Sequence, residues 1–206
     1  MITKNDYLIG ALVGFLSGIA AIPTAFNVGV HSALVLLALP WIGAVAFVIG
    51  IWIAALLSRS MPFFVQFSKF IAVGFLNTAI DFGVLNLLSR VSGVSAGLIL
   101  GGVNIPGFVV AVSNSYFWNK FWVFENKNGG KLFDDLPKFL AVTLIGIFIN
   151  SGIIILVTTY IPPMFGLNKA LWLNLAKAGA TVVTLIWNFS GYKLFVFRTD
   201  NPGSLK

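Results

Sequence analysis

Two stretches of this chain repeat each other about 70 residues apart, and this repeat constrains the fold more than any other feature. The run Lys69–Val73 returns as Lys138–Val142, and Asn119–Phe124 returns as Tyr192–Phe197. Each copy has a basic residue, a long apolar run, a turn, a second apolar run and a basic, aromatic ending. Two apolar runs per copy predict a helical hairpin that has been duplicated in parallel orientation.

The apolar runs are long enough to cross a membrane. The chain is 58% hydrophobic and only 9% charged, whereas soluble domains carry about 25% charged residues. We therefore expect an all-α integral membrane protein whose six transmembrane helices cover residues 8–26, 34–57, 67–89, 96–118, 138–160 and 171–194. The predicted organisation is a two-helix hairpin at 1–60, a four-helix domain at 61–198 and a tail at 199–206.

The distribution of charge predicts the orientation in the cytoplasmic membrane. The net charge is +7, which in a soluble protein would suggest binding to nucleic acid. Here the basic residues lie at the ends of apolar runs, as in membrane proteins, so we expect no nucleic-acid partner. Of 13 Lys and Arg residues, ten fall on one side and only Arg90 and Lys169 on the other, with Lys177 inside a span. The positive-inside rule then places both termini and the loop 120–137 in the cytoplasm.

Several kinds of chemistry are excluded by what the sequence lacks. There is no cysteine, and His31 is the single histidine, so we expect no disulfide, no metal site and no cofactor. The acidic pair Asp134 and Asp135 has no metal-binding motif around it, so we expect no enzymatic activity.

Small residues form a ridge on the first expected span. Gly10, Gly14 and Gly18 recur every four residues and lie on one helical face. Such a ridge lets a second helix approach closely. The partner is either a helix of the same chain or a second copy, which would make this face the seam of a homo-oligomer.

Two charges lie inside the expected spans, Asp81 and Lys177. A charge in the membrane usually faces a cavity or a partner, so we expect both to share one polar cavity at similar depth. The alternatives are a structural salt bridge for Asp81 and snorkelling for Lys177. Neutral polar side chains on the spans either hydrogen-bond between helices or line a path for a hydroxyl-rich group: Asn77, Asn104, Asn114 and Asn150.

The basic, aromatic ending of each copy is a second group of candidate residues. Lys120 lies among aromatic residues that include Trp118 and Trp122, and Lys193 follows Tyr192. These residues belong either to an aromatic belt or to a lipid headgroup site, in which lysines bind phosphate and aromatic rings stack on sugar or prenyl carbons. Lys69 and Lys138 begin the partner helices and should lie at the same level.

The motifs described above resemble the GtrA family over about 67–198. The resemblance rests on Lys69-Phe70 with Val73-Gly74, Asp81, Asn119–Phe124, Lys138-Phe139, Lys177 and Lys193–Phe197. It implies a four-span unit that moves polyprenyl-phosphate-linked sugars across the bacterial cytoplasmic membrane, for a separate glycosyltransferase that decorates an envelope glycan or teichoic acid. This chain departs from the family in its additional N-terminal hairpin.

The resemblance also implies roles for individual residues. The phosphate ligands would be Lys69, Lys120, Lys138, Lys193 and Arg198. The translocation path would be lined by Asp81, Lys177, Asn150, Asn77 and Asn114. Trp118, Trp122 and Tyr192 would stack on sugar or lipid. Because no nucleotide-binding motif is present, facilitated flipping down a gradient is the simplest mechanism.

Two other functions compete with flipping. The first is an accessory subunit that anchors a membrane glycosyltransferase through the loop 120–137 and tolerates neutral substitutions inside the membrane. The second is a small-solute exporter, a class usually built on inverted rather than parallel repeats. The expected partners are therefore a lipid-linked sugar, membrane lipids and a membrane glycosyltransferase.

Overall fold

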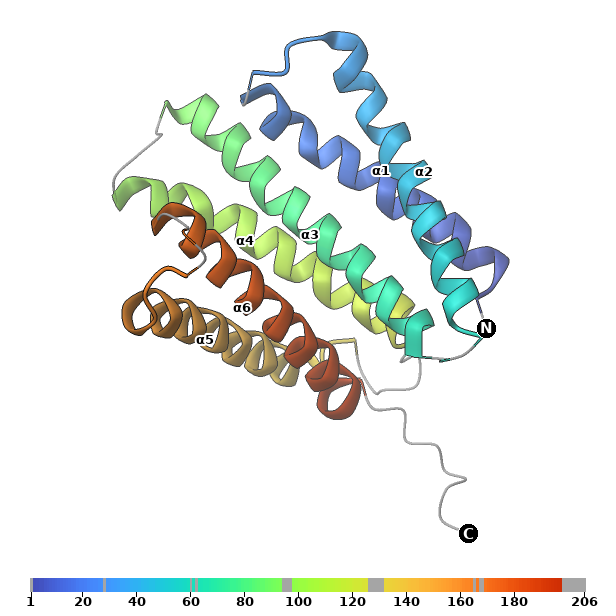
Figure 1. Ribbon diagram of the computed structural model, residues 1–206. Helices are drawn as coiled ribbons and strands as arrows, with labels where there is room; N and C mark the ends of the chain where they lie inside the picture. Colours follow the sequence, from blue (N-terminus) through green and yellow to red (C-terminus); the bar gives the residue numbers. More distant parts are fainter. Residues whose placement is uncertain are drawn as a thin grey trace. The chain divides into compact units, whose positions relative to one another are not determined.

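The computed structural model describes residues 2–27, 29–59, 61, 63–93, 98–125, 132–164, 166 and 169–197. These residues form six α-helices and two short π-helical turns, with no strand among them (Figure 1). In chain order the elements are α1 (Lys4–Asn27), α2 (Ala33–Leu57), α3 (Phe63–Ser92), α4 (Leu98–Trp118), η1 (Asn119–Val123), α5 (Leu136–Tyr160), α6 (Lys169–Gly191) and η2 (Tyr192–Val196). The prediction of an all-α protein is confirmed.

Four of the described helices are long and apolar enough to cross a membrane. They are α1, α2, α3 and the part of α5 at Leu136–Val157, with 24, 25, 30 and 22 residues, and about 20 residues span the hydrocarbon core. Large apolar side chains lie on their surfaces, such as Leu34 at 80% and Phe148 at 74% exposure, as expected where lipid covers the helix. The chain is an integral membrane protein, whereas six spans and a parallel repeat stay predictions.

The chain divides into two compact units. Unit 1 is Met1–Glu125 and contains α1 to η1, and unit 2 is Asn126–Lys206 and contains α5, α6 and η2. The predicted domain boundary at residue 60 lies inside unit 1, because α1 and α2 pack directly against α3. The N-terminal hairpin and the first repeat therefore form one packed body.

Contacts within unit 1 fix the directions of its helices. Asp6 near the start of α1 contacts Lys69 in the first third of α3, and Asn27 at the end of α1 donates to Asn86 near the end of α3 (2.6 Å). Glu125, which follows η1, lies 3.1 Å from the same Lys69. Consequently α1 and α3 run in one direction and α4 runs in the opposite direction.

The glycine ridge of α1 packs on α2. A Cβ atom at Gly14 would collide with the carbonyl oxygen of Gly43, and one at Gly18 would collide with that of Leu39. The two backbones can approach this closely only because α1 has no side chain at these positions. The ridge therefore contacts a helix of the same chain, and homo-oligomerisation stays a prediction.

A larger residue on this ridge should separate α1 from α2. We expect Gly18→Leu to lower the free energy of unfolding by roughly 1–3 kcal/mol, the usual cost of overpacking. Gly50→Leu on α2 is the matched control, because a Cβ atom there meets nothing within 4 Å, and we expect a change of about 0.5 kcal/mol or less. Unfolding in mixed detergent micelles measures both, and equal stability of the two variants would contradict the packing.

Unit 2 is an antiparallel hairpin of α5 and α6 that is joined by polar contacts. The indole nitrogen of Trp187 donates to the carbonyl oxygen of Val142 (3.0 Å), and the hydroxyl groups of Thr143 and Tyr192 lie 2.8 Å apart. Gly191 lets Val142 pack against the α6 backbone, because a Cβ atom there would meet the valine side chain at about 2.5 Å. These contacts hold the start of α5 against η2.

Both repeats end in the same local structure. The backbone N–H of Phe124 donates to the carbonyl oxygen of Asn119 (2.9 Å), and the N–H of Phe197 donates to that of Tyr192 (2.7 Å). Each bond spans five residues, which defines a π-helical turn, a rare element that is frequent at functional sites. The repeated sequence motif thus corresponds to a repeated backbone conformation.

Candidate functional site

Lys69, which the sequence places among the phosphate ligands, lies in a buried ion pair. Its Nζ atom is 2.6 Å from Asp6 Oδ1 and 3.1 Å from Glu125 Oε1. The residue is 3% exposed and Asp6 is 5% exposed. Trp122 donates its indole N–H to the same Asp6 oxygen (3.1 Å). We call Thr3, Asp6, Lys69, Trp122 and Glu125 the Asp6 cluster.

Local sequence explains why Asp6 is held in place. The backbone N–H and the hydroxyl of Thr3 both donate to Asp6 Oδ2, at 2.8 and 2.9 Å, and the N–H of Asp6 lies 3.4 Å from Thr3 Oγ1. This reciprocal arrangement is a capping box. In a capping box, a Ser or Thr caps the start of a helix, and its side chain and that of an acidic residue three positions later each accept a hydrogen bond from the other residue's backbone N–H. The carboxylate therefore receives four donors, two from its own helix end and two from the first repeat.

The Asp6 cluster was missed from sequence, although part of it could have been found. Thr3 and Asp6 precede the apolar run of α1 with capping-box spacing, which predicts the helix start. The contact with Trp122 joins residues 116 positions apart, and no local pattern predicts it. Asp6 belongs to the N-terminal hairpin, so this hairpin contributes directly to the basic end of the first repeat.

Lys120, the second predicted phosphate ligand of the first repeat, is also buried. It is 3% exposed, and its Nζ atom lies 3.4 Å from the hydroxyl of Tyr116 and 5.6 Å from the centre of that ring. The π-helical turn η1 places Lys120 and Trp122 inside the unit rather than on its surface. A phosphate role for Lys69 or Lys120 stays a prediction.

The corresponding lysines of the second repeat lie on the surface. Lys138 and Lys193 are both exposed, and among the described residues neither forms an ion pair. Phe139 stacks on Tyr192 with ring centres 4.7 Å apart. The two lysines adjoin these rings in sequence, so they emerge at the same end of the α5–α6 hairpin.

The predicted stacking residues differ in exposure. Trp118 is half-buried, whereas Trp122 and Tyr192 are each 3% exposed and packed inside their units. Tyr192 already covers Phe139, and Trp122 bonds Asp6. Stacking of a sugar or lipid on these two rings stays a prediction, and it would require the rings to leave their present contacts with Asp6 and Phe139.

The polar residues of the third and fourth expected spans meet in a seam between α3 and α4. Asn114 Nδ2 donates to Asn77 Oδ1 (2.7 Å), and Trp118 Nε1 donates to Asn114 Oδ1 (3.0 Å). Asp81 follows Asn77 by one helical turn and therefore lies on the same face of α3. We call Asn77, Asp81, Asn114 and Trp118 the α3–α4 seam.

Asp81 is the residue of the seam whose bonding is incomplete. A Cβ atom at Gly107 would lie 3.1 Å from Asp81 Oδ1, so the carboxylate packs against the α4 backbone. Its Oδ1 atom is buried and has no hydrogen-bond partner among the described residues. A buried polar atom without a partner is rare in folded proteins and needs an explanation such as water or a ligand.

The second repeat carries a smaller polar contact at the corresponding position. Asn150, which aligns with Asp81, donates to the hydroxyl of Thr184 (3.2 Å). Lys177 belongs to α6, but the side chains of Lys177 and Asn104 and the whole of Arg198 lie outside the described residues. The pairing of Asp81 with Lys177 and the phosphate role of Arg198 therefore stay predictions.

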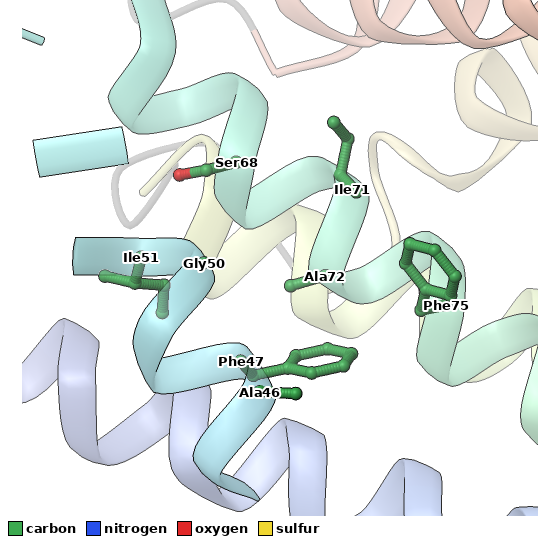
Figure 2. Close-up of a pocket in the computed structure, with 8 residues that line it drawn as sticks. All are labelled: Ala46, Phe47, Gly50, Ile51, Ser68, Ile71, Ala72 and Phe75. Carbon is green, nitrogen blue, oxygen red and sulfur yellow. The ribbon is translucent and has the colours of Figure 1, made fainter. Parts of the chain in front are cut away.

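A separate apolar groove of about 490 Å³ lies between α2 and α3 (Figure 2). It is lined by Ala46, Phe47, Gly50, Ile51, Ser68, Ile71, Ala72 and Phe75. The hydroxyl of Ser68 donates to the carbonyl oxygen of Val65 in its own helix (3.0 Å). The groove therefore suits an apolar lipid chain better than a sugar, and the polar residues of the α3–α4 seam do not line it.

Comparison with known proteins agrees with these features. A family model described as GtrA/DPMS, transmembrane domain, matches residues 69–197. The chain is 32% identical over 133 residues to the "Uncharacterized membrane protein YngA" of Bacillus subtilis (strain 168), which covers 63% of this chain and 77% of YngA. No solved structure matches the chain. The family match contains both repeats and both π-helical turns and leaves Asp6 outside. Because residues 69–197 make up more than half of the chain, the chain belongs to the GtrA/DPMS transmembrane-domain family.

Proposed function

We propose that the protein translocates a polyprenyl-phosphate-linked monosaccharide across the cytoplasmic membrane, for glycosylation of a cell-envelope polysaccharide or teichoic acid. Membership of the GtrA/DPMS family indicates a role in polyprenyl-linked sugar metabolism. The single observation that carries translocation itself is the unpartnered, buried oxygen of Asp81 in the α3–α4 seam.

The chemistry of the α3–α4 seam suits a sugar. Asparagine amides both donate and accept hydrogen bonds, and a carboxylate accepts them strongly, so the seam can replace the water that a sugar loses inside the membrane. The prenyl chain would stay in lipid, and the phosphate would stay near the basic ends of the repeats. Both termini would be cytoplasmic, and no chemical bond of the lipid would break.

Movement between leaflets in proteoliposomes tests this function. A short-chain polyprenyl-phosphate sugar is incorporated into both leaflets, and a membrane-impermeant reagent that modifies the sugar is added outside. We expect about half of the lipid to react without protein and nearly all of it to react with protein. A plateau at one half for correctly folded protein, across a panel of sugars, would refute translocation and favour an accessory subunit that binds a glycosyltransferase through the loop 120–137.

A further inference from the structure

The two repeats share a backbone ending but differ in electrostatic environment. In the first repeat, two buried lysines, Lys69 and Lys120, lie in a unit where Asp6 and Glu125 both contact Lys69. Lys69 is therefore neutralised by carboxylates of the protein itself, and one of the two carboxylates comes from the N-terminal hairpin.

Among the described residues, no carboxylate forms an ion pair with a lysine at the basic end of the second repeat. Lys138 and Lys193 form no ion pair among the described residues, although Asp134 and Asp135 precede α5. The position that corresponds to Glu125 in the sequence repeat is Arg198, so an acid in the first copy is replaced by a base in the second. The cationic charge of this end therefore stays available to an anion from outside the protein.

The surroundings of Lys193 also suit an amphiphile. Its Nζ atom lies 5.8 Å from the centre of the Phe189 ring. The next two residues, Leu194 and Phe195, are 58% and 62% exposed. A cation beside exposed apolar side chains at the end of a membrane helix can bind a phosphate while lipid carbons contact its neighbours.

We propose that the second repeat alone binds the phosphate of the lipid substrate, through Lys138 and Lys193, and that Lys69 has become a structural residue neutralised by Asp6. This assignment rests on the proposed function, because it concerns the same lipid-linked substrate. Its physical basis is that a lysine already bonded to two carboxylates must lose those bonds before it can bind a phosphate, whereas an exposed lysine loses only water.

Equilibrium binding of farnesyl phosphate and of neutral farnesol to the full-length protein in detergent tests the assignment. Wild type should prefer farnesyl phosphate, and Lys138→Gln/Lys193→Gln should weaken its binding at least about tenfold, to the level of farnesol. Lys138→Arg/Lys193→Arg should retain the preference. Lys4→Gln/Arg59→Gln is the matched control, because it removes two exposed charges from unit 1 and should change the affinity by less than about twofold.

Variants of the Asp6 cluster separate the two repeats. Asp6→Asn releases Lys69 from one carboxylate, so it should raise affinity if Lys69 binds phosphate and leave affinity unchanged if the second repeat does. The pair variant Asp6→Asn/Lys69→Gln should also bind as wild type does. Tighter binding by Asp6→Asn, or full binding by Lys138→Gln/Lys193→Gln, would overturn the assignment. No preference of wild type for the phosphate would instead refute the proposed function together with it.

Discussion

Asp81→Asn is expected to slow movement of the lipid-linked sugar between leaflets by roughly 10- to 100-fold. The substitution keeps the size of the side chain and removes its charge, and a hydrogen bond to a charged group contributes about 1.5–3 kcal/mol. Oδ1 of Asp81 is buried without a partner among the described residues, so its substitution leaves no described neighbour unpaired, and the slower rate would come from the lost bond to the sugar.

The initial rate of sugar modification in proteoliposomes measures this effect. Thr78→Val is the matched control, because Thr78 lies on the same helix, is exposed, and donates its hydroxyl only to the carbonyl oxygen of Gly74 (3.0 Å). The control should move the lipid at the wild-type rate. If Asp81→Asn moved the lipid at the same rate as Thr78→Val, the α3–α4 seam would have no role in translocation.

Lys69→Gln is expected to lower the free energy of unfolding by roughly 3 kcal/mol or more. The substitution leaves the Asp6 carboxylate buried with its strongest partner removed, and breaking a buried ion pair from one side typically costs 3–5 kcal/mol. Asp6→Asn should cost less, because Lys69 keeps its contact with Glu125, whose side chain is 62% exposed.

A double-mutant cycle separates this pair from general effects of the substitutions. Asp6→Asn/Lys69→Gln should be more stable than the sum of the single changes predicts, because neither charge is then left alone. Lys138→Gln provides a lysine control on the exposed start of α5 and should change stability by about 0.5 kcal/mol or less. Additive effects, or equal losses for Lys69→Gln and Lys138→Gln, would contradict a structural role for the pair.

Several features of the fold were predictable because they are local or periodic. Helix-forming apolar runs follow from composition, and the repeat follows from two pairs of short motifs. The close approach of α1 to another helix follows from the spacing of Gly14 and Gly18, and the structure identifies α2 as that helix. Hydrogen bonding of span asparagines between helices is confirmed for Asn77 and Asn114.

The candidate site was less predictable because it depends on contacts between distant residues. In the sequence Asp6 is a single acid at the start of a long apolar run, and its bonds to Lys69 and Trp122 arise only when α1 packs beside α3. The π-helical turns were not predicted, since one additional residue in a turn changes no hydrophobic pattern. The two lysines predicted to bind phosphate in the first repeat are both buried, Lys69 beside Asp6 of α1 and Lys120 within η1.

Labelling of a single cysteine in the α3–α4 seam tests the central claim, that this seam carries the sugar, most directly. The chain has no cysteine of its own, so Asn114→Cys can be compared with Val109→Cys, which places a thiol on the exposed apolar face of the same helix. In liposomes, a water-soluble thiol reagent should modify residue 114 and not 109, and the lipid-linked sugar should slow that reaction. Equal labelling of both positions, unchanged by the lipid, would contradict the claim.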